Sequence, residues 1–256
     1  LKTCEKFDLK APNVKQKVTK DTPFFNVDGH KIHIFYDPPH LLKCLRNNYK
    51  NHDLIYNGKV IRWEYLCTFF EHDRKNSVRL APKLSEKHFK LPPFGAMRVN
   101  LAAQIFSHSV AAGVSTFSVV GILPPEAVNT AEFISDVDTL FNIFNSGSLK
   151  SKQPYRNAIQ KNTKHIAKLN EILHKFETMS MLSGKRVPCM DGWVISIKSL
   201  IALWDDLSLN HNFSFLLTNQ DCLEIFFQLF GEGEGTGNDL IPVISGLPFA
   251  SWLCRS

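Results

Sequence analysis

The sequence predicts an α/β unit followed by a long, mostly helical region, that is, an α/β plus all-α fold class. Asp28-Gly29 separates two apolar runs, Phe24–Val27 and Lys31–Tyr36, and such a dipeptide between apolar runs favours a β-hairpin with a tight turn. The second run leads directly to Asp37 and then to a helical pattern that starts near His40. The beginning of the chain is therefore expected to fold as strand, strand and helix.

Beyond Asn57-Gly58 every longer pattern has helical spacing, and no repeat of fixed period appears. The apolar spacing predicts helices over residues 40–50, 62–73, 96–112, a stretch after Pro124-Pro125 that includes Phe133 and Phe144, 164–179 and 196–207. Gly113 is expected to end the third of these. The change from mixed to helical patterns near residue 70 is the predicted domain boundary.

The composition suits a globular intracellular protein with an anionic partner. The chain is 44% hydrophobic, with a formal net charge of +6 and a pI near 9.0, which fits DNA without proving it. The six cysteines include no Cys-x-x-Cys pair, which argues against a zinc module and favours reduced thiols. No apolar run reaches the roughly 18 residues that span a bilayer, so no membrane partner is expected. A start without Met or a signal peptide predicts an internal fragment or a truncated gene product.

Asp37 is the first candidate for a functional residue. Strand ends in α/β sheets place side chains where ligands bind, and a carboxylate there can hold Mg²⁺ for chemistry on phosphates. The alternative is that Asp37 is a turn or N-cap residue ahead of Pro38 and Pro39. The local pattern alone favours this alternative.

A second acidic pair lies towards the C-terminus. Thr218 or Asn219 can cap a helix in which Asp221 and Glu224, three residues apart, share one face. Together with Asp37 they could hold a divalent metal. Acidic residues in a first helical turn are also common because they suit the helix dipole, so both interpretations stay open.

Two motifs and three shorter segments resemble a known family. The motifs are Asp37-Pro38-Pro39-His40-Leu41-Leu42-Lys43 with Arg46-Asn47, and Asn219-Gln220-Asp221-Cys222-Leu223-Glu224 with Phe226-Phe227; the segments are Lys83–His88, Met97–Gln104 and Thr130–Ile134. In the same order, these strings resemble the transposases of P-element type, which include animal transposases with an N-terminal THAP zinc finger. The resemblance covers about residues 22–230.

The resemblance implies an RNase H-like catalytic core interrupted by a helical insertion domain. Residues 1–70 and 213–232 would form parts of the core, residues 71–212 the insertion, and residues 233–256 an unplaced tail. In that family an Asp-Asp-Glu triad binds two Mg²⁺ ions and cuts and joins DNA. Asp37 matches the second aspartate and Glu224 the glutamate, and Asp221 is added here as a third metal-ligand candidate. His40 is interpreted as a structural neighbour of Asp37 rather than as a base.

The resemblance also implies partners and a second cofactor. Transposon ends and target DNA would be the substrates, the protein would be nuclear, and a homo-oligomer is compatible with the family. The family's insertion domain binds GTP. This sequence has no G-x-x-x-x-G-K-[ST] string, so GTP rests on the resemblance alone and no residue is assigned to it.

The sequence departs from the family pattern ahead of Asp37. The first aspartate of the triad should lie tens of residues upstream, and only 36 residues precede Asp37. The chain by itself is therefore expected to be inactive. The alternatives are a domesticated, non-catalytic module that binds DNA or guanine nucleotide, and a decayed gene product without a selected function. Lys43, Arg46 and Lys50 are the candidate DNA contacts, although basic runs are more often solvated faces.

Overall fold

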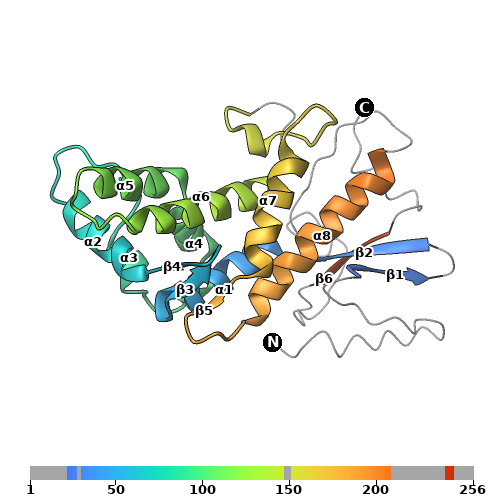
Figure 1. Ribbon diagram of the computed structural model, residues 1–256, viewed down its shortest axis with the longest axis horizontal. Coiled ribbons are helices and arrows are strands. Elements are labelled where there is room, and N and C mark those ends of the chain that lie inside the picture. The colour runs from blue at the N-terminus through green and yellow to red at the C-terminus, as the bar shows by residue number, and fades with distance from the viewer. Residues whose placement is uncertain (1–21, 28–29, 147–150, 209–239, 245–256) are drawn as a thin grey trace. The chain divides into compact units, whose positions relative to one another are not determined.

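The computed structural model describes residues 22–27, 30–146, 151–208 and 240–244. Contacts between Cα atoms divide the chain into two compact units. Unit 1 comprises Leu1–Pro38, Asn142–His174 and Asp191–Ser256, and unit 2 comprises Pro39–Phe141 and Lys175–Met190. Figure 1 shows the elements of both units along the chain. The two units are described separately below.

Unit 1 contains a three-stranded antiparallel sheet. β1 (Phe24–Val27) pairs with β2 (His30–Tyr36), with Phe24 opposite His33, which confirms the predicted hairpin. β6 (Leu240–Ile244) pairs with the other edge of β2, so the strand order is β1-β2-β6. β6 was not predicted, because its partner strand lies some 200 residues earlier in the chain.

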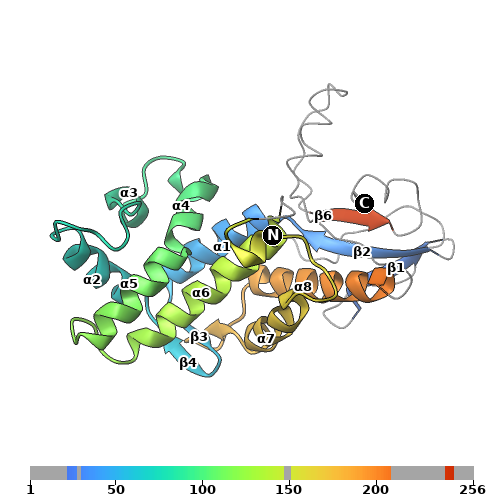
Figure 2. The same ribbon diagram turned by 90° about the horizontal axis from the view of Figure 1, so that it is seen from above.

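Helix α8 (Pro188–Ser208) lies along this sheet, as Figure 2 shows. Ser199 Oγ donates a hydrogen bond of 2.9 Å to the carbonyl of Pro23, just ahead of β1. The buried Trp193 packs edge-on against Phe144, with ring centroids 5.8 Å apart, and Phe144 contacts Phe35 of β2. The helix begins eight residues before the predicted start, at a proline, which suits a first helical position.

Unit 2 begins with α1 (Pro38–Asn51), which confirms the predicted helix after Asp37. Leu42, Leu45 and Tyr49 on this helix are fully buried. The Tyr49 ring packs against Trp63 and Phe133, with centroid distances of 5.2 and 5.3 Å. This packing places α1 in unit 2, so the division by contacts falls at residues 38 and 39 rather than near residue 70.

A second small sheet lies in unit 2 where no strand was predicted. β3 (Leu54–Tyr56) pairs with β4 (Lys59–Ile61) on one side and with β5 (Ser180–Met181) on the other. Asn57 and Gly58 form the turn, with φ of 52° and 70°. Positive φ at both central residues is typical of a type I′ hairpin turn. The Asn-Gly signal was present, but the strands are too short to show an alternating pattern.

The described chain contains further helices in both units. They are α2 (Trp63–Asp73), α3 (Glu86–Phe89), η2 (Gly95–Met97), α4 (Val99–Ile105), α5 (His108–Val119) and α6 (Ala127–Phe144); η3 (Pro154–Arg156) and α7 (His165–Glu177) follow. The predictions for residues 62–73, 164–179 and the stretch after Pro124-Pro125 are confirmed. Among the described residues, no helix combines the length and apolar character needed to cross a membrane.

The helix predicted over residues 96–112 is wrong in two respects. The chain breaks into η2, α4 and α5. Helix α4 ends at Ile105, because the next residue, Phe106, leaves the helical region with ψ of 72°. Gly113 lies inside α5 instead of ending a helix. A Cβ atom there would stand 2.4 Å from Cζ of Phe69 on α2. The glycine is needed for close packing of α2 on α5, a role that the local pattern cannot distinguish from a helix stop.

Candidate functional site

Asp37 occupies the single position between the end of β2 and the start of α1, and its side chain is half-buried. Strand β2, which precedes Asp37, has buried side chains on both of its faces: Ile32 and Ile34 on one face and Phe35 on the other. The backbone N–H of Tyr36 donates to Ser196 Oγ on α8 over 2.9 Å. The carboxyl group of Asp37 thus follows a well-anchored strand, which is the arrangement that the sequence predicted.

The other two predicted metal ligands, Asp221 and Glu224, lie outside the described residues. Within the part of the chain that the structure describes, no three His, Cys, Asp or Glu side chains gather closely enough to hold a metal ion. The metal site built on Asp37, Asp221 and Glu224 therefore stays a prediction. His40 Nε2 lies 3.3 Å from Cys44 Sγ, one helical turn further along α1.

A charged cluster that the sequence did not predict joins β2 to α8 in unit 1. Asp206 Oδ2 accepts a hydrogen bond from Lys31 Nζ at 2.7 Å and lies 2.9 Å from His33 Nε2. Burial lowers the pKa of His33, and the bond to Asp206 only partly opposes this effect. Burial raises the pKa of Asp206, but the bonds from Lys31 and His33 outweigh it and the pKa is lowered.

Unit 1 should lose stability as the pH falls below about 6.5. Burial lowers the pKa of both His33 and His165 below the ordinary value of 6.5. Between that value and the lower folded values, the unfolded chain binds protons that the folded chain excludes, so the free energy of unfolding decreases. Thermal melting between about pH 7.5 and pH 5.5, above the range where most carboxylates titrate, should show this decrease. His165→Gln should flatten the profile. An equally steep profile in that variant would exclude His165 as a source.

Arg46 does not form the exposed basic surface predicted with Lys43 and Lys50. Its side chain is fully buried, and Nη2 donates to the carbonyl of Ala96 at 2.9 Å while Nε donates to Asn47 Oδ1 at 2.7 Å. Lys43 and Lys50 are half-buried on the same helix. Helical spacing placed Arg46 on the same face as Lys43 and Lys50, but it could not reveal that Gly95 and Ala96 bind and cover its side chain.

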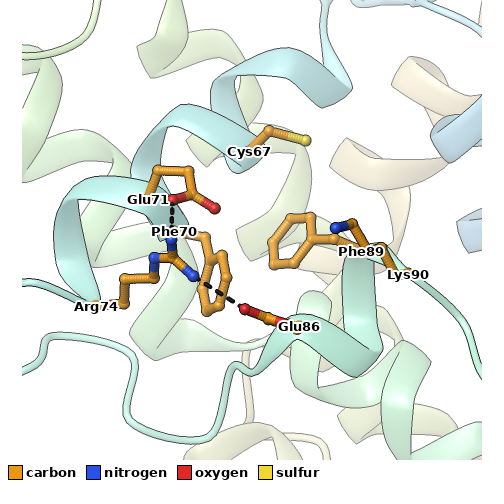
Figure 3. A pocket seen from close by; sticks show the side chains of 7 residues that line it. All are labelled: Cys67, Phe70, Glu71, Arg74, Glu86, Phe89 and Lys90. Carbon is orange, nitrogen blue, oxygen red and sulfur yellow. Dashed lines mark hydrogen bonds and ion pairs between the residues drawn. The ribbon is translucent and has the colours of Figure 1, made fainter.

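A pocket of about 190 Å³ lies between α2 and α3 in unit 2. Figure 3 shows its lining, which consists of Cys67, Phe70, Glu71, Arg74, Glu86, Phe89 and Lys90. Phe70 and Phe89 stack with centroids 4.7 Å apart, and the Arg74 guanidinium pairs with Glu71 at 2.8 Å and Glu86 at 3.1 Å. The pocket was not predicted. Cys67, Glu71 and Arg74 recur at helical spacing, but the residues of α3 come from a separate segment.

The chemistry of this pocket is that of a satisfied ionic network. Each carboxylate already binds Arg74, and burial, aided by the nearby Glu64, raises the pKa of the Cys67 thiol. A thiol with a raised pKa is a poor nucleophile. The pocket therefore offers a small apolar and charged recess rather than a reactive centre.

This chain is similar to one protein family and to two known transposases. Residues 39–158 match the family of the TNP-like, GTP-binding insertion domain. The chain is 29% identical over 209 residues to the transposable element P transposase of Drosophila melanogaster, covering 78% of this chain and 27% of that protein. It is 26% identical over 223 residues to the DNA transposase THAP9 of Homo sapiens, covering 78% and 24%.

A solved structure has the same fold. The Drosophila P element transposase strand transfer complex matches with a TM-score of 0.74 at 27% identity, over 87% of this chain and 52% of that chain. The fold and the matched relatives make this chain similar to a segment of a DNA transposase. The similarity is to transposases of P-element type. The chain spans about a quarter of the length of the curated relatives that it matches.

Proposed function

We propose that this chain is the part of a DNA transposase that supplies two carboxylates of a Mg²⁺-dependent centre for strand cleavage and transfer. The observation that carries the proposal is the position of Asp37, at the end of β2 in a fold that matches the P element strand transfer complex with a TM-score of 0.74. Under this proposal β1, β2 and β6 belong to an RNase H-like core.

The donor set fits the metal that the family implies. Carboxylate oxygens are the ligands that Mg²⁺ prefers, and Asp37 and Glu224 would bind the ions, with Asp221 as an additional ligand. Two bound Mg²⁺ ions would supply activation of the attacking oxygen and stabilisation of the leaving oxygen. The anchored strand end would hold the Asp37 carboxylate in place.

The insertion-domain family match motivates the second part of the proposal. Residues 39–158 match a family described as GTP-binding, so this part of the chain would bind a guanine nucleotide. The match begins where unit 2 begins, at residue 39, and not at residue 71, the predicted start of the insertion. The partners would be transposon ends and target DNA, the protein would act in the nucleus, and a second copy of the protein would complete the assembly.

The chain should bind DNA in a salt-dependent manner and bind GTP in preference to ATP. Lys and Arg contacts to phosphates release counterions, so log K should fall linearly with log salt. Fluorescence anisotropy of labelled DNA over a salt series and of a labelled guanine nucleotide against unlabelled ATP measures both. A flat salt response would contradict the DNA part of the proposal, and equal competition by ATP would contradict the nucleotide part. Binding of both without cleavage in any longer form would favour the non-catalytic module.

A further inference from the structure

The loop between α3 and α4, residues 90–98, presents large apolar side chains to solvent. Phe94 is 80% exposed and Met97 is 69% exposed. Such side chains are ordinarily buried, and an aromatic ring this exposed contributes little to the core of unit 2. The loop is found in Figure 2 between the labels α3 and α4. Only its last two residues, Met97 and Arg98, fall in a segment that resembles the family.

The backbone of this loop holds Phe94 in an unfavourable conformation. Its φ is 58°, in the left-handed region that bulky residues rarely adopt. The next residue must be glycine, because a Cβ at Gly95 would lie 2.7 Å from Cδ of Pro92. Asparagine or glycine would suit the position of Phe94 better. The aromatic ring is therefore present at a cost in backbone free energy.

Buried polar contacts fix the base of the loop. The guanidinium of Arg46, fully buried on α1, donates to the carbonyl of Ala96 at 2.9 Å and to that of Gly95 at 3.4 Å. His88 Nε2 on α3 lies 2.7 Å from Gln104 Oε1 on α4 and ties together the two helices that flank the loop. Phe94 thus projects from a rigid support rather than from a loose connection.

Several exposed cations lie close to Phe94 in the sequence. Lys83, Lys87, Lys90 and Arg98 are exposed, and among the described residues none of them forms an ion pair. The one acidic residue between Lys83 and Arg98 is Glu86, and it is paired with Arg74. The segment therefore combines an exposed aromatic ring with unpaired cations.

We propose that the 90–98 loop is a DNA contact in which Phe94 stacks on an unpaired base while Lys90 and Arg98 bind the flanking phosphates. This inference rests on the proposed function, because it assigns the surface through which a DNA partner is held. Aromatic rings on a rigid support stack on unstacked bases, and adjacent cations bind the backbone. Charge complementarity favours DNA as the occupant of this loop, because its exposed cations would meet phosphates in DNA but a protein of net charge +6 in a second copy of this chain.

Phe94→Asn separates this role from a structural one. Asparagine tolerates the left-handed backbone, so the melting temperature of the variant should stay equal to that of the wild type or rise. Its affinity for a duplex with an unpaired extension should fall by about tenfold, within the range for loss of a stacking aromatic residue. Its affinity for the blunt duplex should change much less. Val78→Asn, at an exposed apolar position in another loop of unit 2, is the matched control and should change neither affinity.

Lys90→Gln combined with Arg98→Gln tests the phosphate contacts. For a single-stranded extension, two lost contacts should reduce the slope of log K against log salt by roughly 1.4. Lys59→Gln, an exposed lysine on β4, should leave the slope within error. If the wild-type chain binds no DNA, the proposed function fails along with this inference. If the wild type binds and both sets of loop variants bind equally well, this inference alone is overturned. Loss of self-association in Phe94→Asn, with unchanged DNA affinity, would assign the loop to a second copy instead.

Discussion

Under the proposed function, Asp37→Asn should abolish Mg²⁺-dependent strand cleavage by a complete transposase that contains this segment, with a loss on the order of 10³-fold or more. The amide keeps the size of the side chain but removes the negative charge that a Mg²⁺ ligand supplies. Because Asp37 is half-buried in a single-residue link between β2 and α1, the fold should persist. Cleavage of a labelled DNA end in Mg²⁺ and in Mn²⁺ measures the loss.

Asp205→Asn is the matched control for this variant. Asp205 is an exposed aspartate on α8, and its replacement should leave the cleavage rate unchanged. Salt-dependent DNA binding should be retained in both variants, because neither change removes a cation. Cleavage at the wild-type rate by Asp37→Asn would remove Asp37 from the metal centre and leave the turn or N-cap interpretation.

Lys175→Met should lower the free energy of unfolding by about 3–5 kcal/mol, the cost of leaving one member of a buried ion pair without its partner. Lys175 Nζ lies 2.8 Å from both Asp136 Oδ2 and Glu132 Oε1. Tyr56 OH donates to the same oxygen of Asp136 at 3.0 Å. Asp136 is buried and Glu132 is about 39% exposed, so most of the loss should come from Asp136. Urea unfolding followed by tryptophan fluorescence measures it.

Two further variants show whether the loss comes from an uncompensated charge. Lys168→Met, which removes an ion pair with the half-exposed Glu171 on α7, should cost at most about 1 kcal/mol. Lys175→Met combined with Asp136→Leu should recover much of the stability, because no buried charge then remains. A double variant as unstable as Lys175→Met alone would show that shape, not charge, governs this site.

The parts of the fold that local patterns specify were predictable from the sequence. The β1–β2 hairpin and helices α1, α2, α6 and α7 each have apolar spacing or a turn dipeptide that is complete within one segment. The parts that were missed depend on distant partners. Strand β6 pairs with β2, and β5 pairs with β3, so neither strand has a partner close to it in the sequence. The local pattern predicts that Gly113 ends a helix, and its actual role depends on the packing of Phe69 against it.

The candidate site likewise has features that the local sequence predicts and features that depend on distant residues. The position of Asp37 after a buried strand came from local sequence, and the family motif named Glu224 as its partner. Burial of Arg46 could not be foreseen, because the carbonyls of Gly95 and Ala96 that bind it lie some 50 residues away. The charged cluster of Lys31, His33 and Asp206 joins segments more than 170 residues apart. Neither arrangement leaves a periodic signal in the sequence.

The central claim is that Asp37 and Glu224 bind the same metal centre. Binding of Mn²⁺, followed by its electron paramagnetic resonance signal, tests it on the wild type, Asp37→Asn, Glu224→Gln and the double variant. If the two carboxylates share ions, each single change should weaken binding strongly and the double change should add little, because the cycle is non-additive for groups that act together. Single variants that bind Mn²⁺ as the wild type does, or losses that simply add, would contradict a shared centre.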